Sequence, residues 1–133
     1  MPKQLSIVCK IQHPISRLKS ASLPALPVDG GSVYTWIPKA TLEALGIMRE
    51  KEITLVTEQG ERITRGVGFA ILCVDKYFTI DEVLFAERGD RPRLGLRSLQ
   101  GLNLVVEPRQ RQLKPAPPHS AAYARDDFAF GFF

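Results

Sequence analysis

The most constraining feature of this 133-residue chain is a region of alternating apolar and polar residues, from 52 to 86, that is broken only by short polar turns. In EITLVTEQGERITRGV, two alternating stretches flank the tetrapeptide Glu58-Gln59-Gly60-Glu61, and further on GFAILCV and YFTIDEVLFA flank Asp75 and Lys76. Alternation with a period of two places successive side chains on opposite faces of a strand, and a short turn joins two such strands into a hairpin. The sequence therefore predicts two successive β-hairpins and a mostly β protein.

Shorter elements are expected on both sides of the hairpins. QLSIVCKI has the composition of a strand that ends before Pro14, and ISRLKSASLPALP indicates a loop leading into a short strand. In IPKATLEALGI, Pro38 suits the first helical position and Gly46 suits the helix stop, which predicts one short helix. RLGLRSLQGLNLVVEP indicates a turn of helix that enters a final strand. We expect one domain over residues 1–113, followed by a Pro-rich linker and aromatic tail over 114–133.

Size and composition are those of one globular domain without a metal or cofactor. A chain of 133 residues buries roughly 70% of its unfolded surface, and 44% hydrophobic with 24% charged residues is ordinary for a globular protein. The two cysteines and two histidines show no pair at metal-ligand spacing, so we expect no metal site. The apolar run LSIVC is too short for a signal peptide or a membrane span. We therefore expect a cytoplasmic protein with no membrane segment.

The net charge of +4 is unevenly distributed along the chain. Residues 1–28 carry four bases and no acids, residues 29–90 carry seven bases and eleven acids, and residues 91–133 carry seven bases and three acids. A basic face could bind nucleic acid. The bases are scattered and aromatic residues do not alternate with them, so we do not expect a nucleic-acid partner.

The motif VDGGSVYTWIP, residues 28–38, places one carboxylate on a flexible corner. Asp29 is followed by Gly30 and Gly31, where the backbone can approach the carboxylate and donate amide hydrogens to it. Ser32 adds a hydroxyl donor. The same residues also suit a surface loop in which Asp29 makes an Asx-type turn, so the motif alone leaves a structural and a catalytic role open.

The wider segment VDGGSVYTWIPKATLEALGI resembles the active-site segment of the retropepsin-like aspartic proteases, and of their bacterial members in particular. In that family an apolar residue precedes Asp-Thr-Gly or Asp-Ser-Gly. The tetrapeptide Glu58-Gln59-Gly60-Glu61 is similar to the family's flap, and Leu94-Gly95 is similar to the apolar-apolar-Gly element that packs beside the active-site loop. The resemblance covers roughly residues 5–113. It implies the closed β-barrel of the acid protease fold, with one or two short helices.

Three departures from the family pattern accompany this resemblance. Gly30 stands where the family has Thr or Ser, so the hydroxyl that bonds across to the other protomer's loop is missing. Arg93 stands where a second aliphatic residue is expected before Leu94 and Gly95, and Pro27 removes one ladder donor from the strand before the motif.

The resemblance implies an aspartic endopeptidase that acts as a homodimer on peptide or protein substrates. Aspartic proteolysis needs two carboxylates that share one proton, and this chain has one Asp-Gly motif because Asp75, Asp90 and the pair Asp126-Asp127 lack a Gly-rich context. The second catalytic carboxylate would be Asp29 of a partner chain across a twofold axis.

The family also implies roles for the residues around the carboxylate. Gly31 would supply an amide donor, and Ser32 would donate its hydroxyl to the outer carboxylate oxygen. Gln59 and Gly60 would offer backbone groups to an extended peptide bound as an added strand.

An active enzyme and an inactive relative both remain open from the sequence. Asp29, Gly31 and Ser32 favour the peptidase, which we take as the main hypothesis. Gly30 and Arg93 favour a catalytically impaired protein of the same fold that serves as a dimerisation or peptide-binding module.

Overall fold

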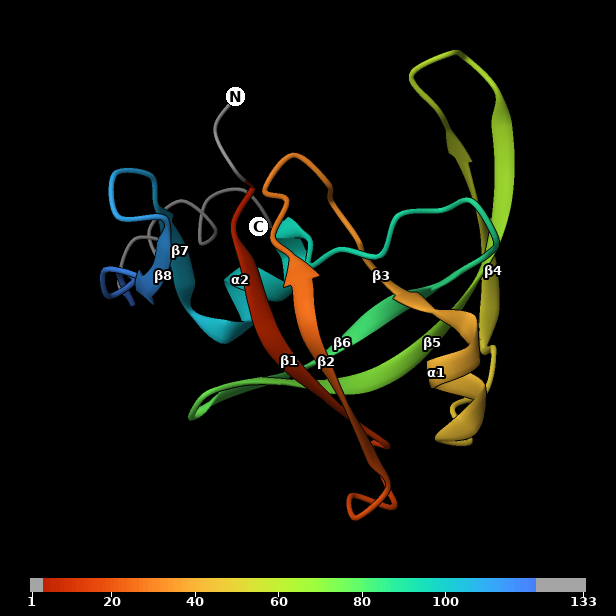
Figure 1. Cartoon of the computed structure of the whole chain (residues 1–133), viewed down its shortest axis with the longest axis horizontal. Helices are drawn as coiled ribbons and strands as arrows, with labels where there is room; N and C mark the ends of the chain where they lie inside the picture. The colour runs from red at the N-terminus through yellow and green to blue at the C-terminus, as the bar shows by residue number, and fades with distance from the viewer. Residues whose placement is uncertain (1–3, 122–133) are drawn as a thin grey trace, which may run out of the picture.

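The computed structural model of the chain describes residues 4–121 and is mostly β with two short helices, as Figure 1 shows. The predicted aromatic tail, from residue 122 on, lies outside the described residues. The elements in chain order are β1 (Ser6–Gln12), β2 (Ser20–Pro27), β3 (Thr35–Pro38), α1 (Lys39–Ala44), β4 (Lys51–Val56), β5 (Arg62–Val74), β6 (Tyr77–Ala86), α2 (Leu96–Leu102), β7 (Leu104–Glu107) and β8 (Gln112–Pro115).

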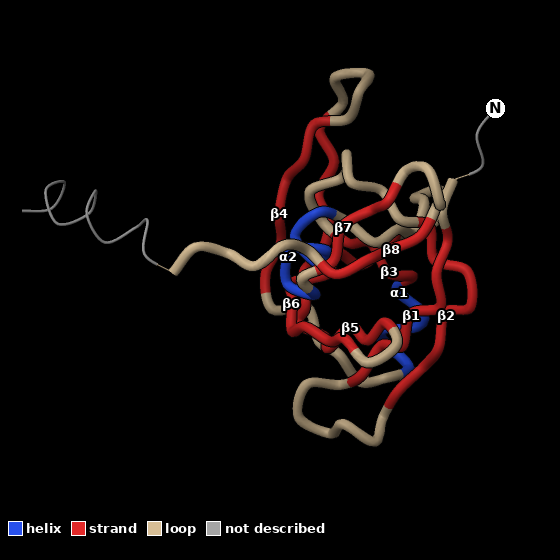
Figure 2. Tube along the Cα trace, turned by 90° about the vertical axis from the view of Figure 1, so that its left-hand side faces the viewer, coloured by secondary structure: helices blue, strands red, loops and turns tan. Residues whose placement is uncertain are grey.

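Six of the strands form one sheet with the order β2-β1-β5-β6-β3, and β4 pairs with β5 beside this path. Strands β3 and β6 are parallel, whereas the other paired strands of the sheet are antiparallel. Strands β7 and β8 form a separate antiparallel pair, which lies in front of α2 in Figure 2. The mostly β class is confirmed. The pairing path ends at β2 and at β3, and residues 4–121 contain no closed barrel.

Both predicted hairpins are present, and they share one long strand. Strand β4 pairs with the first half of β5, and the second half of β5 pairs with β6 across the turn at Asp75 and Lys76. Asp75 has a φ of 51°, a left-handed conformation that Asp tolerates better than most residues. The strand is continuous because Gly68 fits under the segment that leaves α1, where an added Cβ would lie 2.7 Å from the Met48 carbonyl oxygen.

Strand β2 is longer than the short strand expected from ISRLKSASLPALP, and it contains Pro24. Proline lacks the backbone N–H that a central strand needs, so it is confined to sheet edges and bulges. Both conditions hold here, because β2 is the first strand of the sheet order and its register with β1 shifts between Ile7 and Cys9.

The predicted helix after Pro38 is confirmed as α1, which ends before Gly46 at a φ of 75°. Its Leu42 is fully buried in the main core cluster together with Phe85 and Leu94. Trp36 is 6% exposed in a second cluster with residues of β5 and β6. The core thus lies directly beneath the segments that carry the Asp29 motif and Leu94.

Candidate active-site cleft

The loop that carries Asp29 is held by the segment 93–96, which passes between its two ends. On one side, the Leu94 amide donates to the Pro27 carbonyl at 2.8 Å and the Asp29 amide donates to the Leu94 carbonyl at 2.9 Å. These bonds make Val28 and Leu94 a parallel β-bridge. The start of the loop is therefore fixed by a segment more than 60 residues away in the chain.

The same segment binds the far side of the loop. Trp36 and Arg93 exchange two backbone hydrogen bonds of 2.8 and 2.9 Å, and the Leu96 amide donates to the Ser32 carbonyl at 2.7 Å. Gly95 lies where these contacts converge, and an added Cβ there would lie 2.3 Å from the Tyr34 carbonyl oxygen. Only glycine lets the two backbones approach so closely.

A buried chain of hydroxyl groups connects this crossing to strand β6. Ser98 donates to a carboxylate oxygen of Asp81 at 2.8 Å, so its single proton is used there and the Thr35 hydroxyl must donate to the Ser98 oxygen at 2.6 Å. The Gly95 amide in turn donates to the Thr35 oxygen at 2.8 Å. Thr35 and Ser98 are fully buried, so this relay satisfies every polar group in it and ties α2 to the loop.

Both oxygens of the Asp29 carboxylate have donors. The Gly31 amide donates to Oδ1 at 3.0 Å, the interaction proposed for Gly31 from the sequence. Arg91 donates from Nη2 to Oδ2 at 2.9 Å, and the Arg93 Nε lies 3.9 Å from the same oxygen. The Ser32 hydroxyl donates to the Tyr34 carbonyl at 2.8 Å, so in the protomer it does not contact the carboxylate.

The Arg91 contact was not expected from the sequence, in which its surroundings appeared only as a polar loop. Gln4 supports the arginine, because its Oε1 accepts from Arg91 Nη1 at 2.8 Å while its Nε2 donates to the Val28 carbonyl at 3.1 Å. No local pattern could indicate a pair whose members are 62 residues apart. The excess of arginines before Leu94 was the one available signal.

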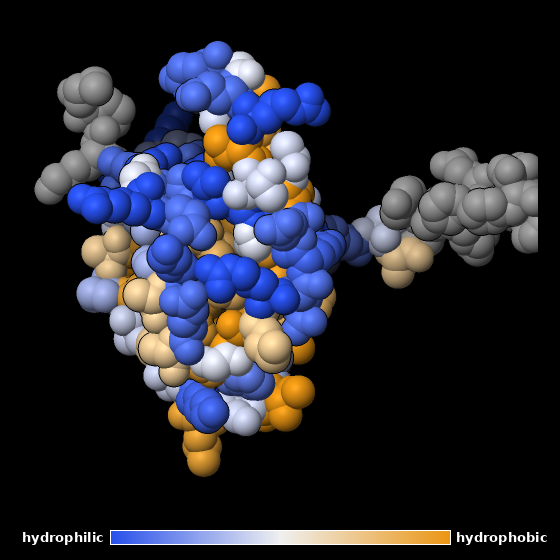
Figure 3. All heavy atoms as spheres, turned by 90° about the vertical axis from the view of Figure 1, so that its right-hand side faces the viewer, coloured by the Kyte–Doolittle hydropathy of each residue, from blue (hydrophilic) through white to orange (hydrophobic). Residues whose placement is uncertain are grey.

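A cleft of about 550 Å³ opens between the Asp29 loop and the β4–β5 hairpin. One wall consists of Gly31 and Ser32 with the aromatic residues Tyr34 and Trp36, and the opposite wall consists of hairpin residues, including Leu55, Ile63, Glu58 and Gln59. Arg91 and Arg93 line it as well. Figures 1 and 2 show the hairpin projecting from the body of the protein, and in Figure 3 the projecting end carries mainly hydrophilic side chains.

The four residues of the predicted flap form the turn of this hairpin. Thr57 and Glu61 close it, through a backbone bond of 2.8 Å and a bond of 3.1 Å from the Glu61 amide to the Thr57 hydroxyl. Gly60 adopts a φ of 84°, which glycine accepts without strain. Glu58 and Gln59 border the cleft, whereas Gly60 and Glu61 are not among its lining residues.

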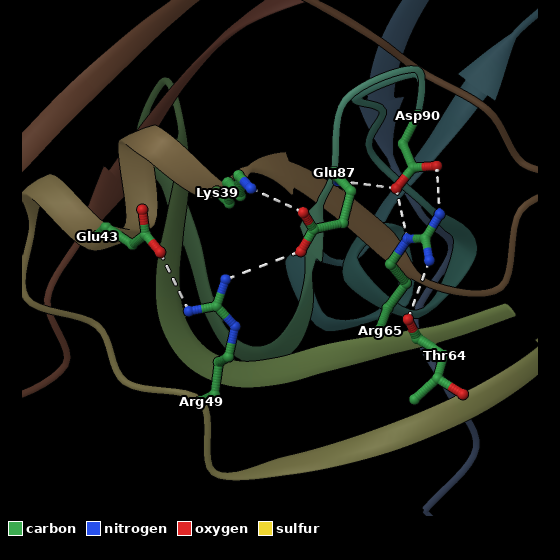
Figure 4. Close-up of polar contacts among 7 residues, drawn as sticks. All are labelled: Lys39, Glu43, Arg49, Thr64, Arg65, Glu87 and Asp90. Carbon is green, nitrogen blue, oxygen red and sulfur yellow. Dashed lines mark hydrogen bonds and ion pairs between the residues drawn. The ribbon is translucent and has the colours of Figure 1, made fainter.

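The loop that supplies the arginines is anchored to β5 by an ion pair, drawn in Figure 4. Arg65 binds both carboxylate oxygens of Asp90, at 2.6 and 2.9 Å, and the Glu87 amide also donates to this carboxylate. These donors, the Arg65 side chain first, lower the pKa of Asp90 below its ordinary value. Lys39 binds Glu87 at 2.8 Å and so attaches the same loop to α1.

Other chemistries find little support in the described residues. Residues 4–121 contain no group of three or more potential metal ligands, and no helix among them is long and apolar enough to cross a membrane. Cys9 is a free thiol, and burial together with nearby Cys73 raises its pKa to about 12, so it is protonated and unsuited as a nucleophile.

Comparisons with known proteins add no assignment. A scan against protein-family models found no match to this chain, and a search of curated proteins found none either.

The site residues proposed from the sequence come together in two groups. Asp29, Gly31 and Ser32 lie next to Leu94 and Gly95 at the crossing. The hairpin turn lies across the cleft, with Glu58 and Gln59 facing it. Gly30 stands apart, because no atom lies within 4 Å of the position of an added Cβ.

We expect Gly95→Ala to destabilise the protein and Gly30→Ala to be tolerated. The methyl group of an alanine at position 95 would clash with the backbone of Tyr34, which cannot move without breaking the crossing. Overpacking of this kind costs about 1–3 kcal/mol or more. The Gly30 methyl enters open space. Urea unfolding of the two variants measures the difference, and equal free energies of unfolding would contradict the proposed role of Gly95.

The ion pair between Arg65 and Asp90 should make stability depend on pH. Because the pKa of Asp90 is lowered in the folded state, the pair stabilises the protein above the ordinary carboxyl pKa, and this contribution is lost as pH falls through the folded pKa. Asp90→Asn should reduce the free energy of unfolding at neutral pH by about 1–2 kcal/mol.

The deficit of the Asp90→Asn variant should stay level from about pH 7 to 5 and should shrink as pH falls from about 4 to 2. Asp75→Asn in the exposed turn is the matched control, since Asn also tolerates the left-handed conformation. Urea titrations across this pH range test the prediction, which is wrong if the deficit stays constant.

Proposed function

We propose that this chain is one protomer of a homodimeric aspartic endopeptidase of the retropepsin type. The observation that carries the proposal is the placement of Asp29. It lies on a Gly-rich loop fixed on both sides by the Leu94–Gly95 segment, and the next residues of that loop line a cleft beneath a projecting hairpin. The bond from the Gly31 amide to Asp29 is by itself that of an Asx turn, but such a turn on a surface loop would need neither the crossing nor the cleft.

In the proposed dimer, Asp29 of each protomer lies at the twofold axis. One carboxylate accepts a proton from the attacking water while the other donates a proton to the oxygen of the scissile carbonyl. The Gly31 amide orients Oδ1 of each carboxylate. The Asp29 side chain is 28% exposed in the protomer, which leaves it accessible to a partner and to water.

The cleft suits an extended peptide. The backbone of the hairpin turn at Glu58 and Gln59 borders it, and the walls offer aromatic and aliphatic surface for side chains. Peptides that bind in this way gain affinity from main-chain hydrogen bonds and selectivity from pockets for alternate side chains.

A second function is favoured by two features of the Asp29 loop. Arg91 occupies Oδ2 of Asp29, and Gly30 has no hydroxyl to bond across the twofold axis. A dimeric peptide-binding module without catalysis would retain the cleft and tolerate both features. Peptide cleavage separates the two functions.

The peptidase should lose cleavage when Asp29 is replaced. We expect the wild-type protein to cleave members of a mixed peptide library between about pH 4 and 7, and Asp29→Asn to lose at least a thousandfold because both carboxylates of the catalytic pair, one from each chain, are removed. Mass spectrometry of the library gives the readout. Glu43→Asn, on the exposed side of α1, is the control. Cleavage that survives Asp29→Asn removes Asp29 from the mechanism.

Restoring the missing hydroxyl should strengthen the dimer. Gly30→Thr should tighten self-association by about tenfold, because each protomer gains a hydrogen bond to the other loop. Gly30→Val is the matched control, since it adds the same volume at the same open position without the hydroxyl. Sedimentation equilibrium measures both variants. If Thr and Val act alike, the hydroxyl does not explain the strength of the dimer.

A further inference from the structure

Positive charge is concentrated at one corner of the cleft. Arg91 and Arg93 both line it, and the carboxylate they approach is Asp29 in both cases. Asp90 also lines the cleft, but its carboxylate is bound by two nitrogens of Arg65 and by a backbone amide. Glu58, the other acidic residue of the lining, belongs to the hairpin turn. Two guanidinium groups therefore approach the single carboxylate of Asp29 at this corner.

Arg91 has N–H groups that are not used by Gln4 or Asp29. Its side chain is 51% exposed, and two of its five N–H groups are used by Gln4 and Asp29. Gln4 and Asp29 hold the guanidinium from one side, so its position is fixed before a ligand arrives. A preorganised guanidinium binds a carboxylate in the bidentate geometry that lysine cannot offer.

Arg93 forms the junction between the charged corner and the apolar wall. Its guanidinium stacks over the Trp36 ring at 4.6 Å, and its Nη1 donates to the Arg91 carbonyl at 2.6 Å. Burial, and next to it the charge of Arg91, lower the pKa of Arg93, while the charges of Asp29 and Asp90 act in the opposite direction. Tyr34 continues the wall from this point, and Trp36 lies mostly buried behind Arg93.

We propose that the cleft selects extended peptides in which an acidic side chain stands near an apolar one, with the carboxylate bound by Arg91 and Arg93 and the apolar side chain placed against the half-buried lining residues Tyr34, Leu55 and Ile63. This inference rests on the proposed peptide cleft and names its substrate class. The arginine that departs from the apolar pattern before Leu94 and Gly95 thereby becomes a specificity residue.

The experiment uses peptides whose central bond is a reduced amide, so that binding is measured without cleavage. Glu is scanned through every position around an apolar centre, and each Glu peptide is compared with its Gln counterpart by fluorescence anisotropy. At the best position, the wild-type protein should bind the Glu peptide about tenfold or more tightly than the Gln peptide, the difference expected for hydrogen bonds to a charged group. Added salt should reduce this preference.

Variants assign the preference to its residues. Arg91→Gln should abolish the Glu preference, so that the variant binds the Glu and Gln peptides with equal affinity. Arg93→Lys keeps the charge and loses the planar fork, so it should weaken the preference in part. Arg109→Gln, in the exposed turn between β7 and β8 and outside the cleft lining, is the control and should bind as wild type does. Circular dichroism verifies that each variant is folded.

The outcomes separate this inference from the proposed enzyme. Equal binding of Glu and Gln peptides, a preference that survives Arg91→Gln, or no binding of either peptide overturns the acidic selectivity. Cleavage of the corresponding natural-bond peptides is measured in parallel. A Glu preference in binding without Asp29-dependent cleavage supports the acidic selectivity and overturns the peptidase. Asp29-dependent cleavage without a Glu preference supports the peptidase and overturns the acidic selectivity.

Discussion

The backbone crossing at residues 93–96 is the constraint on which the rest of the site depends. A segment that pairs with residues on both sides of the Asp29 loop fixes the loop at its two ends, and the loop needs no internal secondary structure to hold its shape. The cost of this arrangement is steric. At Gly95 the two backbones lie too close for any side chain, so a single glycine allows the whole crossing. Because these contacts join residues about 60 positions apart, they form only when the sheet is assembled.

The polar groups buried by this crossing are paired through two small hydroxyl side chains. Thr35 and Ser98 are small enough to lie within the core and still reach the Gly95 amide at one end and Asp81 at the other. A buried hydroxyl without a partner costs about 1–3 kcal/mol, so the relay is stabilising only because every member is satisfied. In residues 4–121 no buried side-chain oxygen or nitrogen lacks a partner. The hydroxyl relay thus connects the Asp29 loop to α2 and β6.

Local sequence patterns predicted much of the fold, whereas contacts between residues distant in the chain could not be predicted from them. The two hairpins and α1 were predicted because period, turn residues and caps act over a few positions. Strand β2 was underestimated because a proline argues against a strand, and only the sheet order shows that β2 is an edge. Asp29 and its Gly31 donor could be proposed from neighbouring residues. The contact with Arg91 could not, since it depends on where a distant loop comes to lie.

The two proposed functions, an active enzyme and a binding module, differ in whether the Oδ2 atom of Asp29 stays available beside Arg91. Asp29 uses Oδ1 for the Gly31 amide and Oδ2 for Arg91, yet each carboxylate oxygen can accept two hydrogen bonds. Room therefore remains on each oxygen for a water or a partner carboxylate, provided that Arg91 lies to one side of the twofold axis. Gln4 connects Arg91 to the Val28 backbone. In the proposed dimer, Arg91 would be compatible with catalysis as long as Gln4 holds it to one side, and it would compete with the second carboxylate if that support were lost.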